Sequence, residues 1–127
     1  ADGVRPTRVS RIGHLLMAAV VKYNPFVLKQ LRAEGWHATP VDYWDSFTRR
    51  TKDLYGCIDV LGTGPQGTIA VQVTSRSNMS SRRKKVLAAD AWQPMVDAGW
   101  IIEIWGYSQP GGKGTRYELK RERLNPK

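Results

Sequence analysis

The centre of the chain alternates apolar and polar positions in two short runs separated by a turn. Residues 58–61 and 69–73 are mostly apolar, and a glycine-rich cluster occupies positions 62–67. This pattern predicts a β-hairpin whose connection is longer than two residues. Asp59 and Gln72 stand where apolar residues are expected, and in an antiparallel pair they would lie side by side on one face. Polar side chains buried in this way need a partner or a function.

Apolar residues recur at helical spacing through the first part of the chain. Positions 10–23 place them every three or four residues, which predicts an amphipathic helix. A second helix is predicted over 25–34, because Pro25 suits a first helical position and Gly35 suits a helix stop. A single long helix kinked at Pro25 is the alternative. Residues 1–9 are expected to form a loose arm.

Two segments of contrasting character lie between the predicted helices and the hairpin. Residues 36–44 are aromatic and β-branched, which predicts a strand, and Pro40 confines that strand to a sheet edge or breaks it. Residues 45–52 are polar and basic, so we expect a loop there.

The last third of the chain predicts a helix followed by a second hairpin. The helix runs from residue 80 to about 98, and Pro94 is expected to kink or split it. Residues 100–107 are the most strand-like run, and a glycine-rich loop joins them to a strand over 116–124. This order of elements predicts one α/β domain over 1–127, with a mixed central sheet flanked by helices.

Composition points to a folded protein with a polyanionic partner. The 127 residues fit one domain, and 41% of them are hydrophobic, which is enough for a core. Twenty Lys and Arg against eleven Asp and Glu give a net charge of +9, which favours nucleic acid as partner, ahead of an anionic membrane surface. The longest apolar run, 15–21, is too short to span a bilayer, and no signal-peptide pattern is seen. We therefore expect a cytoplasmic, DNA-associated protein.

The histidine and cysteine content argues against two kinds of site. Cys57 is the single cysteine, so an internal disulfide and a cysteine cluster for a metal are both excluded within one chain. His14 and His37 are far apart in the sequence and show no ligand spacing, so a structural zinc site is not expected.

Basic residues gather at the start of the predicted third helix and beside the central hairpin. Cations at a helix N-terminus oppose the helix dipole, whereas a bound phosphate makes the same arrangement favourable. The alternative is a solvated basic face. The candidate phosphate-binding residues are Arg49, Arg50, Lys52, Arg76, Arg82, Arg83, Lys84 and Lys85.

The central hairpin resembles the active-site hairpin of the PD-(D/E)xK nuclease superfamily. Residues 58–61, IDVL, look like its first motif, and residues 70–75, AVQVTS, look like its second. The resemblance covers roughly residues 25–107 and is closest to archaeal-type Holliday junction resolvases. It implies a restriction-endonuclease-like fold, with a mixed central sheet flanked by helices.

The same resemblance implies a metal-dependent site and shows two departures from the family pattern. Asp59, Gln72 and Asp53 would hold Mg²⁺ or Mn²⁺, and Thr74 would complete the catalytic set. The family has Glu or Asp where this chain has Gln72, and Lys where it has Thr74. Asn24 falls roughly where many resolvase-like relatives carry an acid. The missing positive charge could come from one of three nearby residues, namely Lys52, Arg76 and Lys84.

Three functions are consistent with these patterns. The first is a metal-dependent DNA endonuclease that hydrolyses phosphodiester bonds, with branched DNA as substrate and a symmetric homodimer as the working form if the resolvase resemblance extends that far. The second is a non-catalytic nucleic-acid-binding module that keeps the nuclease fold. The third is a protein-interaction or inhibitor role, in which the basic surface meets an acidic partner.

Overall fold

A five-stranded mixed sheet forms the centre of the computed structural model, which describes residues 23–126. The sheet order is β1-β4-β5-β6-β7. The strands are β1 (His37–Pro40), β4 (Val60–Gly64), β5 (Gly67–Ser75), β6 (Ile101–Ser108) and β7 (Glu118–Arg123). β5 and β6 are parallel, and the other neighbouring strands are antiparallel. The expected mixed α/β sheet is therefore confirmed, with β1 at one edge as Pro40 requires.

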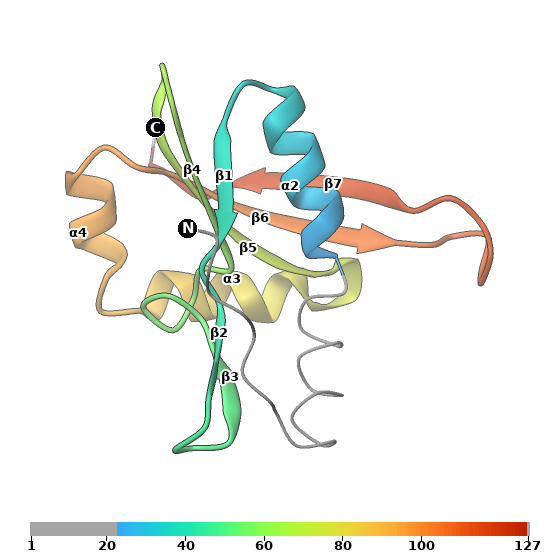
Figure 1. Cartoon of the computed structure of the whole chain (residues 1–127), viewed down its shortest axis with the longest axis horizontal. Coiled ribbons are helices and arrows are strands. Elements are labelled where there is room, and N and C mark those ends of the chain that lie inside the picture. Colours follow the sequence, from blue (N-terminus) through green and yellow to red (C-terminus); the bar gives the residue numbers. More distant parts are fainter. Residues whose placement is uncertain (1–22, 127) are drawn as a thin grey trace.

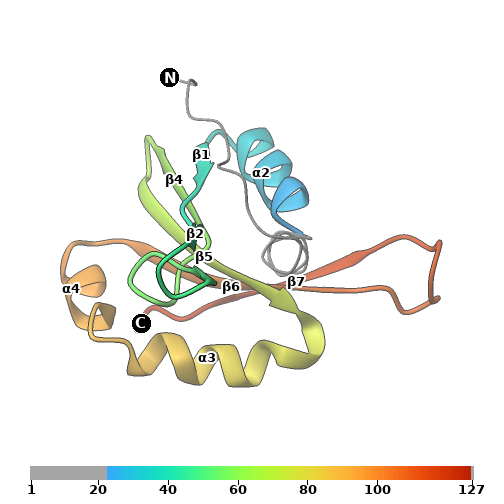
Figure 2. The ribbon, with the colours of Figure 1, turned by 60° about the horizontal axis from the view of Figure 1, so that its bottom comes forward.

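Helices cover both faces of this sheet (Figures 1 and 2). Helix α2 (Asn24–Ala33) lies on one face. The crossover from β5 to β6 runs over the other face through the 3₁₀ turn η1 (Arg76–Asn78) and the helices α3 (Met79–Ala88) and α4 (Trp92–Asp97). A parallel strand pair needs a crossover of this kind.

The alternation of β5 side chains supplies a hydrophobic core on each side. Val71 and Val73 belong to the cluster that includes Val27 and Leu31 of α2. Residues of the opposite parity point to the other face, where Ala70 packs in the cluster that includes Val86 of α3 and Met95 of α4. Gln72 and Thr74 share that second parity, so their positions lie on the α3 side of the sheet.

The central hairpin forms in the expected register but with a tighter turn. Gly64 pairs with Gly67, so the connection is the two residues Pro65 and Gln66 rather than the longer loop that the glycine cluster indicated. Gly62 serves packing instead of the turn, because a Cβ there would lie 3.0 Å from Ile69 Cγ2 and 3.2 Å from Trp36 Cβ. The lack of a side chain at this position lets Trp36 cover the strand.

Residues 45–52 are not the simple loop expected from their polarity. Strands β2 (Tyr43–Asp45) and β3 (Arg50–Lys52) pair antiparallel and form a separate two-stranded hairpin. Figure 1 shows this hairpin projecting away from the five-stranded sheet. Because it projects into solvent, it lacks the apolar alternation by which a strand is recognised in a sequence.

The predicted third helix divides before Pro94 rather than at it. Ala89 takes an extended conformation after α3, and α4 begins at Trp92, which leaves Pro94 in the first turn of α4. Proline is tolerated there because the first-turn N–H groups have no partner within the helix. The strands expected over 100–107 and 116–124 are confirmed as β6 and β7.

Some expectations fall outside the part of the chain that the structure describes. These are the helix over 10–23, the arm over 1–9 and the location of His14. Within residues 23–126, no helix is long and apolar enough to cross a membrane.

Candidate functional site

A cavity of about 410 Å³ opens where β5 ends and α3 begins. Asp53, Asp59, Gln72 and Thr74, the four residues predicted to be catalytic, all line it. The wall also includes Thr51 of β3 and two basic residues of α3 described below. The hairpin register and the chain reversal after β3 therefore bring the predicted set together.

Asp59 and Gln72 meet as the strand pairing predicts. Asp59 lies directly before β4, and its backbone N–H donates to Val71 O at 2.9 Å. Asp59 Oδ2 accepts hydrogen bonds from Gln72 Nε2 and from the backbone N–H of Val73, the latter at 2.8 Å. Asp59 is 3% exposed and Gln72 is 1% exposed, so neither polar group is solvated.

Asp53 lies against Asp59 from the end of the β2–β3 hairpin. Burial raises the pKa of Asp59 to about 8, and the charge of Asp53 together with a hydrogen bond between the two carboxyl groups adds to the rise. This pair therefore favours either a shared proton or a bound cation, because two adjacent buried negative charges repel each other.

Asp42 extends the acidic group and was not among the predicted residues. The backbone N–H of Val41 donates to Asp59 O at 2.8 Å, which holds the segment before β2 beside Asp59. Asn24 Nδ2 donates to Asp42 Oδ2 at 3.3 Å. Burial raises the pKa of Asp42; the Asn24 hydrogen bond opposes this rise and the charge of Asp53 adds to it. No local sequence pattern marks Asp42, since its place depends on the path of the chain after β1.

Lys85 of α3 brings a positive charge to the cavity. Its ammonium group forms an ion pair with Asp53 Oδ2 at 3.2 Å and lines the cavity. The residues predicted for this role lie elsewhere. Lys52 Nζ pairs with Asp45 at 2.9 Å, whereas Arg76 and Lys84 are exposed and do not line the cavity. Lys85 was predicted only as a phosphate contact, because its approach to Asp53 depends on how α3 packs on the sheet.

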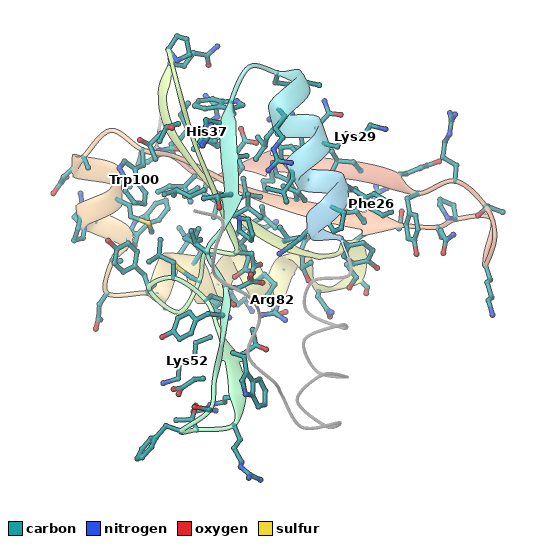
Figure 3. All side chains as sticks on the ribbon, viewed as in Figure 1. Phe26, Lys29, His37, Lys52, Arg82 and Trp100 are labelled. Carbon is teal, nitrogen blue, oxygen red and sulfur yellow. The ribbon has the colours of Figure 1, made fainter. Side chains whose placement is uncertain are left out.

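The predicted phosphate-binding residues divide into three groups. Arg82 joins Lys85 on the cavity wall. Two are paired with acids: Arg83 is held by Glu122, with bonds of 2.7 Å from Nε and 2.6 Å from Nη2, and Lys52 is held by Asp45. The exposed residues are Arg49, Arg50, Arg76 and Lys84. Figure 3 shows Arg82 on α3 and Lys52 on the β2–β3 hairpin.

The donor set fits a divalent cation only if an amide oxygen takes part. Residues 23–126 contain no group of three His, Cys, Asp or Glu side chains arranged to hold a metal. Gln72 Oε1 is buried and has no hydrogen-bond partner among the described residues. Carboxylate and amide oxygens are the ligands that Mg²⁺ and Mn²⁺ take from proteins. Asp53, Asp59 and Gln72 Oε1 would provide three such oxygens.

Comparisons with known proteins found no relative of this chain. No family model, curated protein or solved structure matches it. The function must therefore be argued from the cavity itself.

Proposed function

We propose that this protein is a metal-dependent DNA endonuclease that hydrolyses phosphodiester bonds at the cavity beside β5. The observation that carries the proposal is that two carboxyl groups, Asp53 and Asp59, line one cavity together with Gln72, whose buried side-chain oxygen has no hydrogen-bond partner among the described residues. The resemblance of the hairpin to the PD-(D/E)xK superfamily supports the same chemistry.

The residues around the cavity have distinct roles in this proposal. Asp53 and Asp59 would hold Mg²⁺ or Mn²⁺ with the help of Gln72. When bound, such a cation lowers the pKa of a coordinated water and offsets negative charge on the phosphate. Lys85 is held in place by Asp53 and presents an ammonium group to the phosphate, and Arg82 adds a second positive charge on the same wall. Thr74 contributes a hydroxyl donor.

The substrate in this proposal is DNA, because the net charge of +9 favours a polyanion. If the resolvase resemblance extends to the substrate, the DNA is branched and the enzyme acts as a homodimer, since two symmetric cuts require two symmetric sites.

A non-catalytic nucleic-acid-binding module is the second candidate, and one observation favours it. The amide nitrogen of Gln72, not its oxygen, faces Asp59 in the structure. A hydrogen bond of this kind satisfies the buried carboxyl group without a cation. In such a module the cavity would bind a phosphate through Lys85 and Arg82 and leave the bond intact.

Cleavage assays with labelled duplex, single-stranded and four-way-junction DNA separate the two candidates. In Mg²⁺ or Mn²⁺ the wild type should cut at least one of these DNAs, and EDTA should stop it. We expect Asp59→Asn to lower the rate by about 1,000-fold, since loss of a metal ligand removes several kcal/mol of transition-state stabilisation. Asp90→Asn, which changes an exposed acid outside the cavity, should stay within about twofold.

A second measurement reports on the cation without activity. Mn²⁺ should raise the melting temperature of the wild type, because a ligand that binds only the folded state stabilises it. The Asp59→Asn variant should show no such rise. If the wild type binds DNA but neither cuts any of the three DNAs in either metal nor gains stability from Mn²⁺, the protein is a binding module instead.

A further inference from the structure

The β2–β3 hairpin presents an aromatic ring to solvent at its tip. Phe47 lies in the turn between the two strands and is 95% exposed. Tyr43, at the start of β2, is also more than half exposed. Single exposed apolar residues are common on protein surfaces. Phe47 differs from these because it stands on an element that projects from the body of the protein (Figure 1).

The turn that carries Phe47 is held in one conformation by Asp45. Asp45 Oδ1 accepts from the Phe47 backbone N–H at 3.0 Å, and Oδ2 accepts from Thr48 Oγ1 at 3.0 Å. The backbone oxygen of Asp45 accepts from Arg49 N at 2.7 Å. The Lys52 ammonium and these hydrogen bonds lower the pKa of Asp45 to about 2, so the carboxylate keeps its charge at neutral pH. A preorganised turn loses little conformational entropy when the ring binds a partner.

Charge and position connect this tip with the cavity. Arg49 and Arg50 follow Phe47 after one intervening residue, Thr48, and are exposed. Thr51, the next residue of β3, lines the cavity, and Asp53 lies two residues further on. An exposed apolar ring and two exposed arginines at one hairpin tip suit a nucleic acid, because the ring can stack on a base while the arginines contact phosphates.

We propose that the hairpin inserts Phe47 into DNA where base stacking is already interrupted, so that the preferred substrate is a junction, mismatch or flap rather than intact duplex. Opening a regular stacked step costs a few kcal/mol, and this cost is smallest where a base is unpaired or mismatched. The inference rests on the proposed function in taking DNA as the partner. The tip lies roughly 15 Å along β3 from Asp53. At 3.4 Å per nucleotide, the phosphate in the cavity is about four nucleotides from the inserted ring.

Binding measured in EDTA tests the inference without any need for cleavage. The probes are three labelled DNAs: an intact duplex, the same duplex with a two-base mismatch, and a four-way junction. Each disrupted DNA carries 2-aminopurine beside the disruption. The wild type should prefer the disrupted DNAs and quench the 2-aminopurine fluorescence by stacking. Phe47→Ala should lose about tenfold in affinity for them, about 1.4 kcal/mol, and lose the quenching, with duplex affinity within about twofold of wild type.

Two further variants separate ring stacking from general effects. Phe47→Trp should keep both the preference and the quenching, because the larger ring also stacks. Leu87→Ala removes an exposed apolar side chain from α3 and should change neither. The inference is overturned if Phe47→Ala weakens binding to all three DNAs equally or to none. It is also overturned if Phe47→Ala loses affinity for anionic lipid vesicles and not for DNA. A protein that shows the Phe47 effect but cuts no DNA would contradict the endonuclease and leave this inference standing.

Discussion

Glu103 and Asp59 are both almost completely buried in the central sheet, yet their surroundings are opposite in charge. The Glu103 carboxylate accepts bonds of 2.9–3.2 Å from the indole N–H of Trp105 and from the guanidinium groups of Arg121 and Arg123. Arg121 also lies over the Trp105 ring, 4.2 Å from its centroid. Asp59 has neutral donors and faces the carboxyl group of Asp53.

This difference separates a structural acid from one that is available for chemistry. The charge of Glu103 is offset by two cations, so the network is complete within the protein. Asp59 itself accepts from neutral donors alone, and Lys85, a cation of the cavity wall, is paired with Asp53 instead. A buried acid in a strand can therefore be either a structural acid or one that is available for chemistry. The charges of its neighbours on adjacent elements decide between the two.

The largest expected effect on stability comes from breaking the Glu103 network. Glu103→Gln should lower the free energy of unfolding by about 3 kcal/mol, because it leaves two arginines without their buried counter-charge. Urea denaturation measures this loss. Glu118→Gln, an exposed acid on the same terminal hairpin, should change stability by less than about 0.5 kcal/mol. Equal effects of the two substitutions would show that Glu103 carries no special structural role.

A smaller change in the free energy of unfolding, opposite in sign, is expected for Asp59→Asn, and it depends on pH. The folded-state pKa of Asp59 is raised from 3.8 to about 8, so between these values the folded protein holds a proton that the unfolded chain has released. This group therefore makes folding less favourable as the pH rises through that window. Asp59→Asn removes the penalty, so the variant should gain stability relative to wild type as the pH rises from 5 to 9.

Urea denaturation in EDTA at the two pH values measures this change, and the comparison of variant with wild type cancels the titration of all other groups. A difference between the two proteins that stays the same at both pH values would show that Asp59 is already ionised at pH 5.

The smallest expected effect is on DNA affinity and concerns two adjacent arginines of α3. Arg82 lines the cavity, whereas Arg83 is engaged by Glu122. Arg82→Ala should weaken DNA binding severalfold and reduce the slope of log affinity against log salt by about one, as expected for one lost phosphate contact. Arg83→Ala should leave that slope unchanged. Equal slopes for both variants would place the DNA away from the cavity.

The sequence predicts those parts of the site that depend on the pairing of two neighbouring strands. Period-two alternation and antiparallel pairing were sufficient to place Asp59 beside Gln72, and the polar interruption of an apolar strand drew attention to both. The proximity of Asp53 was suggested as well, because only six residues separate it from Asp59.

Other parts of the site depend on packing between distant elements, which local patterns do not encode. Lys85 reaches Asp53 because α3 docks on the sheet after the crossover, and Asp42 approaches Asp59 because of the chain path after β1. Residues 45–52 of the β2–β3 hairpin are predicted as a loop because they are polar and basic and lack apolar alternation. The split of the helix near Pro94 is predicted from the sequence alone, because proline interrupts a helix at the residues just before it, with which its ring would clash.

The parallel pairing of β5 with β6 has a consequence for the order in which the site assembles during folding. Asp59 and Gln72 are 13 residues apart and meet by closing one short hairpin, an event that takes microseconds. Asp53 and Lys85 are 32 residues apart and meet only when the crossover has docked. We therefore expect the Asp59–Gln72 pair to form first and the cationic wall of the cavity last, so that a chain emerging from the ribosome completes its cavity only after β6 has been made.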